Sequence, residues 1–417
     1  MSFEKKLTNA IENNKNKKRF HTPGHAGTLL KNDITELDYS DNLISPENIL
    51  KELENNIASI YNVEACFIST QGATHNIFQA IYACGEKGAF LVVGKAHVSI
   101  FNAMRGFKYK TYHTDVLDFN SIPEDVKTII VTSPNYEGKV LDLEKICSEA
   151  HSRNIRVIVD ASHGSHFAFS QLLPKSATLY GDLVIHSLHK TLNVITGGSV
   201  LLCKKEYADR ANLCRKLLHT TSPSYATITS IENAIYDIQT CGEREYRKVL
   251  NAIESFKSTL PKEFSLLEND DKTRVVLVSK YSGKALSKYL SICGVEVEMA
   301  IENRVILIVT PWNYKGLKKV SKVLKDVQGL EVFIGEEIPY LKHGVPTLLQ
   351  FEGEPIKVKL EDAVNKKSYL EVGIYPPGVP LVYSNDLLSQ EVIDTLLRFK
   401  KSYDLFGLDN GFIYVLK

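Results

Sequence analysis

Between about Pro46 and Val200, helical patterns alternate with short apolar runs, and this alternation constrains the fold more than any other feature of the sequence. The runs "ACFIST", "AFLVVG", "TIIVTSP", "RVIVDAS", "LVIHS" and "GSVLLC" are rich in valine, isoleucine and leucine, without clean apolar–polar alternation. Such runs are typical of strands that are buried on both faces. Helical segments such as "NILKELENNIASIYN" place their apolar side chains on one face. The pattern predicts an α/β fold with a mostly parallel sheet covered by helices.

Changes in this pattern divide the chain into three predicted segments. Residues 1–45 are polar and loop-rich, and we expect an N-terminal arm. Residues 46–244 carry the strand–helix alternation and the start of a helical stretch, and they are predicted to form a large domain. Residues 245–417 alternate runs such as "RVVLVS", "VEVEMA" and "RVILIVT" with helical patterns, which predicts a smaller C-terminal α+β domain.

Composition excludes several classes of protein. The 50 basic and 49 acidic residues give a net charge of +1, so nothing favours nucleic acid or an anionic membrane as a partner. No apolar run approaches the roughly 20 residues of a membrane span, and the N-terminus lacks the apolar core of a signal peptide. The seven cysteines are odd in number and form no C-x-x-C motif. A cytoplasmic location is therefore expected.

Polar residues follow several of the predicted strands, at the sheet edge where open parallel sheets bind ligands. "ACFIST" continues into "QGATHN", where Gly72 permits close backbone approach and the helix N-terminus suits a phosphate. An ordinary turn capped by Thr74 is the alternative. "RVIVDASHGSHF" ends its strand with Asp160, a carboxylate that needs a cation or hydrogen bonds if it is buried. His163 and His166 follow as H-x-x-H, but no third ligand is suitably spaced, so we expect no metal.

Lys190 ends the stretch "HSLHK", directly after a buried strand. A lysine at a strand end is ordinarily a surface residue, but here Ser187, His189 and Thr191 flank it. A lysine, an aspartate and a phosphate cradle on one sheet edge are what a pyridoxal phosphate site requires. The lysine forms a Schiff base, and the aspartate pairs with the pyridine nitrogen. Motifs of nucleotide-binding loops, zinc proteases and serine hydrolases are absent from the sequence.

A series of sequence blocks, in order along nearly the whole chain, resembles the ornithine/lysine/arginine decarboxylases. The blocks include "HTPGHAGT", "STQGATHN", "VDASHGSHF", "HSLHKTL", "TTSPSY" and "YPPGVP". The resemblance implies a pyridoxal-phosphate-dependent enzyme of fold type I, the aspartate-aminotransferase-like fold, in the short form of the family. It also implies that residues 46–244 bind the cofactor, and that the chain forms a homodimer with its active site at the subunit interface.

The same resemblance implies roles for individual residues. Lys190 would carry the cofactor, and Asp160 would keep the pyridine nitrogen protonated. His97 would stack on the cofactor ring, and His163 would lie beside it. Lys190 or His189 would return a proton to the α-carbon. The remaining expected cofactor contacts are Ala73, Thr74, His75, Ser187, His189 and, from the partner subunit, Ser222.

The implied reaction is decarboxylation of a basic L-amino acid to its amine and CO2, as in polyamine metabolism. An aminotransferase or lyase of the same fold and a weakly active cofactor-binding protein are the alternatives, because several positions depart from the family pattern. The departures include "QGAT" at the phosphate turn, "HVS" at residues 97–99 and "ITGGS" at residues 195–199. A basic substrate needs a carboxylate for its distal cation. The candidates are Asp33, Glu36, Asp41, Glu298 and Asp386.

Overall fold

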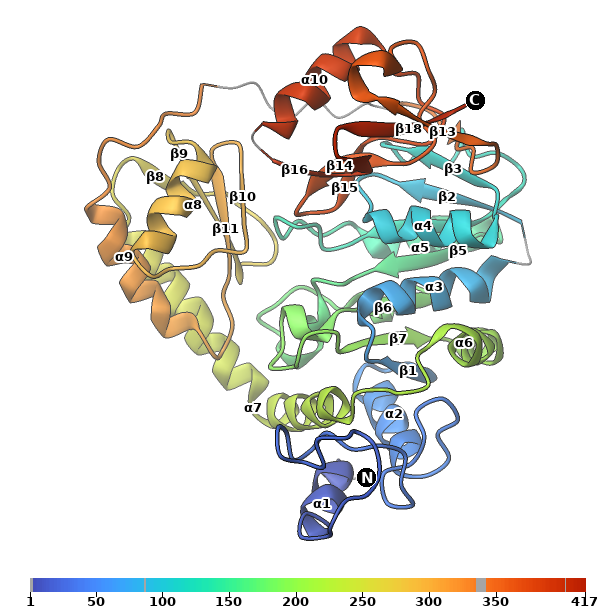
Figure 1. The fold of residues 1–417 in the computed structure, drawn as a ribbon. Helices are drawn as coiled ribbons and strands as arrows, with labels where there is room; N and C mark the ends of the chain where they lie inside the picture. Colours follow the sequence, from blue (N-terminus) through green and yellow to red (C-terminus); the bar gives the residue numbers. More distant parts are fainter. Residues whose placement is uncertain (1–2, 86–87, 335–342, 402) are drawn as a thin grey trace. The chain divides into compact units, whose positions relative to one another are not determined.

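A computed structural model describes residues 3–85, 88–334, 343–401 and 403–417 (Figure 1). Contacts divide the chain into two compact units. The first unit contains Met1–Ala83, Ser133–Leu143 and Val159–Gly335, and the second contains Cys84–Thr132, Glu144–Ile158 and Glu336–Lys417. The division into an arm, a large domain and a small domain by chain order remains a prediction.

The large-sheet strands of the first unit lie in the order β1-β7-β6-β5. Strand β7 pairs antiparallel with both β1 and β6, and every residue of β6 and β7 is buried. Burial on both faces explains why these runs lack apolar–polar alternation. The bounds are β1 (Ala65–Ser69), β5 (Arg156–Asp160), β6 (Leu183–His186), β7 (Ser199–Cys203), α1 (Lys6–Asn13), α2 (Ile49–Ile60), α3 (Gly72–Cys84), α6 (Lys205–Leu218) and α7 (Tyr225–Ser258).

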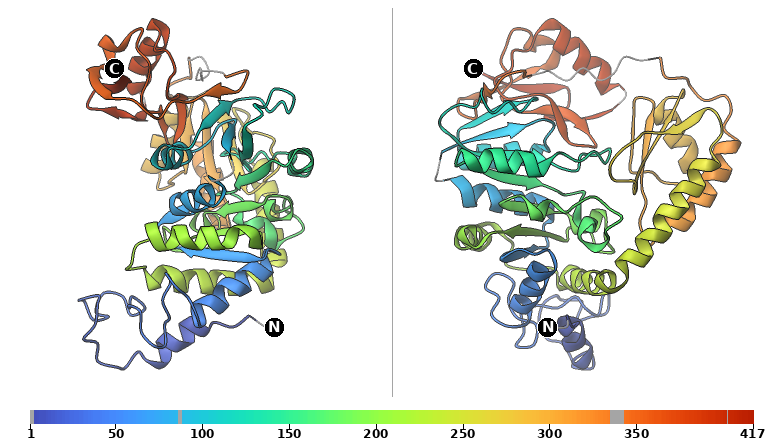
Figure 2. Two further views of the ribbon diagram at one scale, coloured as in Figure 1. Left: turned by 90° about the vertical axis from the view of Figure 1, so that its right-hand side faces the viewer. Right: turned by 180° about the vertical axis from the view of Figure 1, so that it is seen from behind.

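A four-stranded antiparallel sheet, in the order β10-β11-β9-β8, lies at the far end of α7 within the same unit (Figures 1 and 2). Its core joins α7 to the sheet through buried residues such as Val249, Leu277, Leu286 and Leu324. Of the run "VEVEMA", only Met299 and Ala300 belong to strand β10, which pairs with β11. The bounds are β8 (Phe264–Leu266), β9 (Arg274–Ser279), β10 (Met299–Ile301), β11 (Arg304–Ile308), α8 (Gly283–Ile292) and α9 (Leu317–Lys325).

The second unit contains parallel strands and two small antiparallel sheets. Strand β2 pairs in parallel with β3 and β4, and β12 adds to β3 in the antiparallel direction. The "YPPGVP" segment forms a hairpin between β14 and β15. The bounds are β2 (Ala89–Val93), β3 (Thr111–Thr114), β4 (Val126–Thr132), β12 (Thr347–Leu348), β13 (Pro355–Lys359), β14 (Val372–Tyr375), β15 (Val379–Val382), β16 (Asp404–Phe406), β17 (Leu408–Asp409), β18 (Phe412–Leu416), α4 (Val98–Phe107), α5 (Leu143–Ser152) and α10 (Gln390–Lys400).

No helix in the described ranges combines the length and the apolar character that crossing a membrane requires.

Candidate active site

Lys190 lies in a short turn that follows the buried strand β6. The turn is a 3-10 helix, Leu188–Lys190, held by the fully buried Leu188. The Lys190 Nζ atom lies 3.1 Å from Nε2 of His163 and 5.8 Å from the centre of the Tyr136 ring. Burial lowers the pKa of Lys190 below its ordinary value of 10.5, although the negative charge of Asp160 opposes this shift. A lowered pKa makes the amine a better nucleophile at neutral pH.

Asp160 ends strand β5, next to β6 in the sheet of the first unit. The backbone amide of Ala161 donates to the carbonyl of Ile185 at 3.0 Å, so the carboxyl ends of the two strands meet. The Asp160 carboxylate is only 3% exposed, and its Oδ1 accepts hydrogen bonds from the hydroxyl and the amide of Ser162. The aspartate and Lys190 therefore occupy one edge of the sheet, as the strand-end argument predicts.

His163 connects Lys190 to two residues that the sequence did not single out. Its Nδ1 lies 3.0 Å from Nη2 of Arg274, the first residue of β9, which is 1% exposed. Its ring centre lies 4.5 Å from that of Tyr136, at an interplanar angle of 59°. In the sequence, Tyr136 stands in the segment "TSPNYEG", and Arg274 begins the run "RVVLVS".

Two glycines of "ITGGS", the segment that departs from the family pattern, lie beside the expected phosphate cradle at the start of α3. The Gly72 amide donates to the carbonyl of Gly197 at 2.7 Å, and the His189 amide donates to the carbonyl of Gly198 at 3.3 Å. Gly197 has φ +93°, and a Cβ there would lie 2.8 Å from the Thr70 carbonyl oxygen. These bonds bring the Lys190 turn to the N-terminus of α3. The positive φ and the close approach of Thr70 therefore favour glycine at position 197.

The other expected phosphate residues of the first unit differ in their surroundings. Ala73 is half-buried and Thr74 is exposed at the start of α3. Nδ1 of His189 lies 3.4 Å from the Ser187 hydroxyl, and burial lowers the pKa of His189. His75 packs edge-on against His219, and its nitrogens have no hydrogen-bond partner among the described residues. Burial lowers the pKa of His75 to about 3, so it is neutral at physiological pH.

The roles predicted for His97 and Ser222 remain predictions. His97 belongs to the second unit, where it precedes α4 and accepts the amide of Ser99 at Nδ1. A Cβ at Gly378, in the "YPPGVP" turn, would come within 2.9 Å of the His97 ring. Ser222 is exposed in the first unit, and its amide donates to the Thr220 hydroxyl.

His166, the second histidine of H-x-x-H, is buried among polar residues that bond to its ring. Its Nε2 lies 3.1 Å from the hydroxyl of Thr273 and 3.4 Å from the carboxylate of Asp271, and all of these residues are buried. Among the described residues, no group of three or more histidine, cysteine, aspartate or glutamate side chains could hold a metal ion.

Among the acidic candidates for a distal cation, Glu298 is the one whose charge acts on the site. Its carboxylate accepts a hydrogen bond of 2.9 Å from the Tyr136 hydroxyl. Its negative charge also raises the pKa values of Lys190 and His189, against the dominant effect of burial. The side chain is exposed. A carboxylate in this place can receive a cation that reaches outward from Lys190.

The other four acidic candidates have local partners. Asp386, in the second unit, lies 2.9 Å from Nε2 of His343. In the first unit, the partners are the His25 ring for Asp33, the Thr35 hydroxyl for Glu36, and the amides of residues 47, 48 and 50 for Asp41. Each of these four carboxylates is therefore engaged in a local hydrogen bond that orders its own segment.

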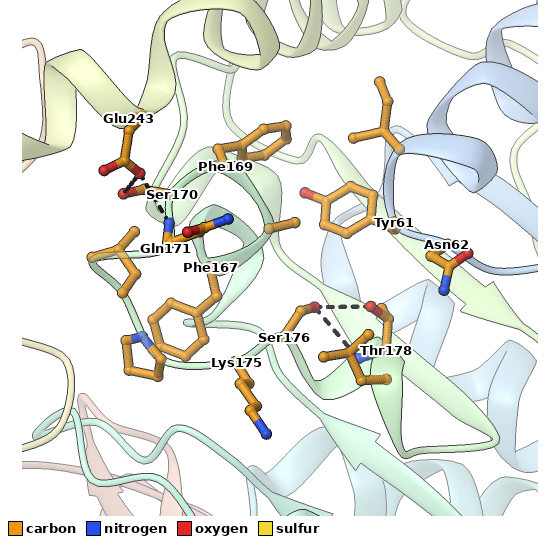
Figure 3. A pocket seen from close by; sticks show the side chains of 15 residues that line it. Tyr61, Asn62, Phe167, Phe169, Ser170, Gln171, Lys175, Ser176, Thr178 and Glu243 are labelled. Atoms are coloured by element: carbon orange, nitrogen blue, oxygen red, sulfur yellow. Dashed lines mark hydrogen bonds between the residues drawn. The ribbon is translucent and has the colours of Figure 1, made fainter.

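A separate pocket of about 730 Å³ opens in the first unit (Figure 3). Tyr61, Phe167 and Phe169 line it, and Figure 3 shows the Glu243 carboxylate bonded to Ser170 and to the backbone of residue 171. None of the predicted site residues lines this pocket. Its volume alone therefore does not mark the place of the chemistry.

Comparison with known proteins shows which family and which relatives this chain is similar to. Residues 105–277 match the family model described as Orn/Lys/Arg decarboxylase, major domain. The matched segment includes Asp160 and Lys190, and the predicted resemblance to this family is confirmed. The chain is 25% identical to an arginine decarboxylase of Bacillus anthracis, over 94% of this chain and 92% of that protein. It is also 27% identical to the uncharacterized protein YaaO of Bacillus subtilis, over 92% and 91%.

Solved structures of lysine decarboxylases share the fold of this chain. The Francisella novicida lysine decarboxylase LdcF has a TM-score of 0.82 at 16% identity, over all of this chain and 81% of that one. The constitutive lysine decarboxylase of E. coli has a TM-score of 0.77 at 18% identity, over 100% and 82%. The predictions of fold type I and of pyridoxal phosphate as the cofactor are confirmed.

The residues present also fit this cofactor chemically. A lysine of lowered pKa suits the aldehyde, and a buried carboxylate suits a protonated pyridine nitrogen. The amides at the start of α3 and the Ser187 hydroxyl suit a phosphate.

Proposed function

We propose that this protein catalyses the pyridoxal-phosphate-dependent decarboxylation of a basic L-amino acid, arginine, lysine or ornithine, to the corresponding amine and CO2. The observation that carries the proposal is the half-buried amine of Lys190, 3.1 Å from His163, on the same sheet edge as the Asp160 carboxylate. The named relatives, an arginine decarboxylase and two lysine decarboxylases, support the choice of a basic substrate.

Separate residues of the chain attach the cofactor, hold its phosphate and control its protonation. When bound, pyridoxal phosphate supplies a reactive aldehyde and a conjugated ring that takes up the electron pair left by the departing CO2. Lys190 attaches the cofactor, and Lys190 or His189, in its protonated form, returns a proton to the substrate α-carbon after CO2 leaves. Asp160 holds a proton at the pyridine nitrogen. The amides of Ala73 and Thr74, with Ser187 and His189, hold the phosphate.

Incubation of the purified protein and cofactor with each basic amino acid tests this function. We expect CO2 and the matching amine to appear in equal amounts from at least one of arginine, lysine and ornithine. An aminotransferase would instead convert the cofactor to its amine form without CO2, and a cofactor-binding protein would turn over no amino acid. If none of the three substrates releases CO2, the proposed function is wrong.

Glu298 is proposed to receive the distal cation of the substrate. Replacing Glu298 with glutamine keeps the side-chain shape and removes the charge, so we expect KM to rise about tenfold, with kcat nearly unchanged. Steady-state kinetics of the best substrate measures this. Glu296→Gln is the matched control, because Glu296 lies two residues away and bonds to Ser291. Equal KM values for Glu298→Gln and the wild type would exclude this role.

The assembly and location are proposed with the function. A homodimer with Ser222 from the partner subunit at the active site follows from the family resemblance, and sedimentation equilibrium that shows only monomer would contradict it. The odd, widely spaced cysteines without C-x-x-C support a cytoplasmic location. Cell fractionation tests that location.

A further inference from the structure

A hydrogen-bonded series joins a buried arginine to the reactive lysine. Nη2 of Arg274 lies 3.0 Å from Nδ1 of His163, and Nε2 of the same ring lies 3.1 Å from Nζ of Lys190. Arg274 and His163 are both buried, at 1% and 4% exposure. In the described part of the chain, Nε and Nη1 of Arg274 have no hydrogen-bond partner. Because a buried cation with few hydrogen bonds is unfavourable, the hydrogen bond to His163 stabilises the buried Arg274 guanidinium.

The donors and acceptors in this series permit only one arrangement of protons. A guanidinium can only donate, so Nδ1 of His163 must accept. A neutral imidazole then carries its proton on Nε2, and this N–H donates to the nitrogen of Lys190. That nitrogen can accept only if it has a lone pair. An ammonium on Lys190 would require both ring nitrogens to accept, which a neutral imidazole cannot do.

Other charged groups act on Lys190 from the elements around it. Asp160 on β5 and Glu298 before β10 favour the ammonium, whereas Arg274 on β9 disfavours it. His189 precedes Lys190 in the same turn, and the Tyr136 ring lies against both His163 and Lys190. The negative charges of these two carboxylates thus favour the protonated form of Lys190. The series from Arg274 opposes them by hydrogen-bond geometry as well as by charge.

We propose that Arg274 is a positioning residue that fixes the His163 ring with its proton on Nε2, and so keeps the side-chain amine of Lys190 neutral before it meets the cofactor. The proton that Lys190 would otherwise hold stays in solvent. A neutral Lys190 amine has a lone pair that can attack a carbonyl carbon, and the use of this lone pair in catalysis rests on the proposed function. The protonation state itself does not, and it is measurable without substrate.

The pH dependence of Lys190 labelling tests the proposal. Full-length protein freed of cofactor is trace-labelled with acetic anhydride at a series of pH values, and mass spectrometry follows the Lys190 peptide against that of the exposed Lys175. We expect a wild-type midpoint below the ordinary 10.5. Arg274→Met should raise it by about one pH unit or more, and Arg274→Lys should restore much of the shift. An unchanged midpoint in Arg274→Met overturns the proposal.

Two controls separate the hydrogen-bonded series from a general effect of charge or folding. Arg304→Met removes a cation from the same sheet, where Arg304 bonds to Glu137, and should leave the Lys190 midpoint in place. In a His163→Ala background, Arg274→Met should shift the midpoint far less than it does when His163 is present. An equal shift in both backgrounds means that Arg274 acts by its field alone, and the proposal fails.

A measurement on the wild-type protein covers the case in which Arg274→Met does not fold. Nitrogen-15 NMR of histidine-labelled protein, with His163 assigned by its loss in His163→Gln, reports which ring nitrogen carries the proton. We expect the proton on Nε2 at neutral pH. A proton on Nδ1, or on both nitrogens, overturns the proposal. Either result leaves the CO2 assay, and with it the proposed function, independently testable.

Discussion

Replacement of Lys190 with alanine is expected to reduce amine release from the best basic amino acid by about 10⁴-fold or more. The variant loses the amine that attaches the cofactor, and it loses a group able to move a proton at the substrate α-carbon. Neither His163 nor His189 can replace both roles.

The measurement has two parts. Borohydride treatment of the protein with pyridoxal phosphate, followed by peptide mass spectrometry, should place the reduced adduct on Lys190 in the wild type and find none in Lys190→Ala. Lys175→Ala is the matched control, since Lys175 is exposed in a neighbouring segment, and both adduct and activity should persist. An adduct of wild-type yield in Lys190→Ala would show that attachment occurs elsewhere.

The strands of the large sheet were predictable because burial determines their composition. "LVIHS" and "GSVLLC" become β6 and β7, whose residues are all buried, so their apolar runs are a direct consequence of the fold. The strand Thr111–Thr114 was not predicted, since "TYHT" has no apolar run, although three of its four residues are buried. Its polar side chains find partners within the fold, as His113 does with the Gly94 carbonyl. Such long-range bonds leave no periodic signal in the sequence.

The part of the site that follows the strand ends could be inferred from the sequence, and the part supplied by distant segments could not. Asp160 and Lys190 stand directly after buried strands, so sheet geometry brings them to one edge. Arg274 reaches His163 across 111 positions of sequence, and no local pattern encodes that contact. Gly197 was noticed only as a departure from the family pattern. Its positive φ and its closeness to Thr70 give the physical reason for glycine.

Replacement of Asp160 with asparagine is the second change with a large expected effect. Asparagine keeps the size of the side chain, and its carbonyl oxygen can still accept the hydrogen bonds that Ser162 gives to Oδ1. What is lost is the negative charge that holds a proton at the pyridine nitrogen. Removing one partner of a buried charge pair costs about 3–5 kcal/mol. That range corresponds to roughly a hundredfold to several-thousandfold in rate.

We therefore expect kcat of Asp160→Asn to fall by at least about a hundredfold, while the thermal unfolding midpoint changes little. Kinetics with the best substrate and circular dichroism measure the two quantities. Asp160→Glu, which keeps the charge, should retain more activity than Asp160→Asn. Asp237→Asn is the control, because Asp237 lies on α7 and pairs with Lys5 at the surface. If Asp160→Asn keeps wild-type kcat, the carboxylate does not act on the cofactor, and Asp160 serves only to order the loop through Ser162.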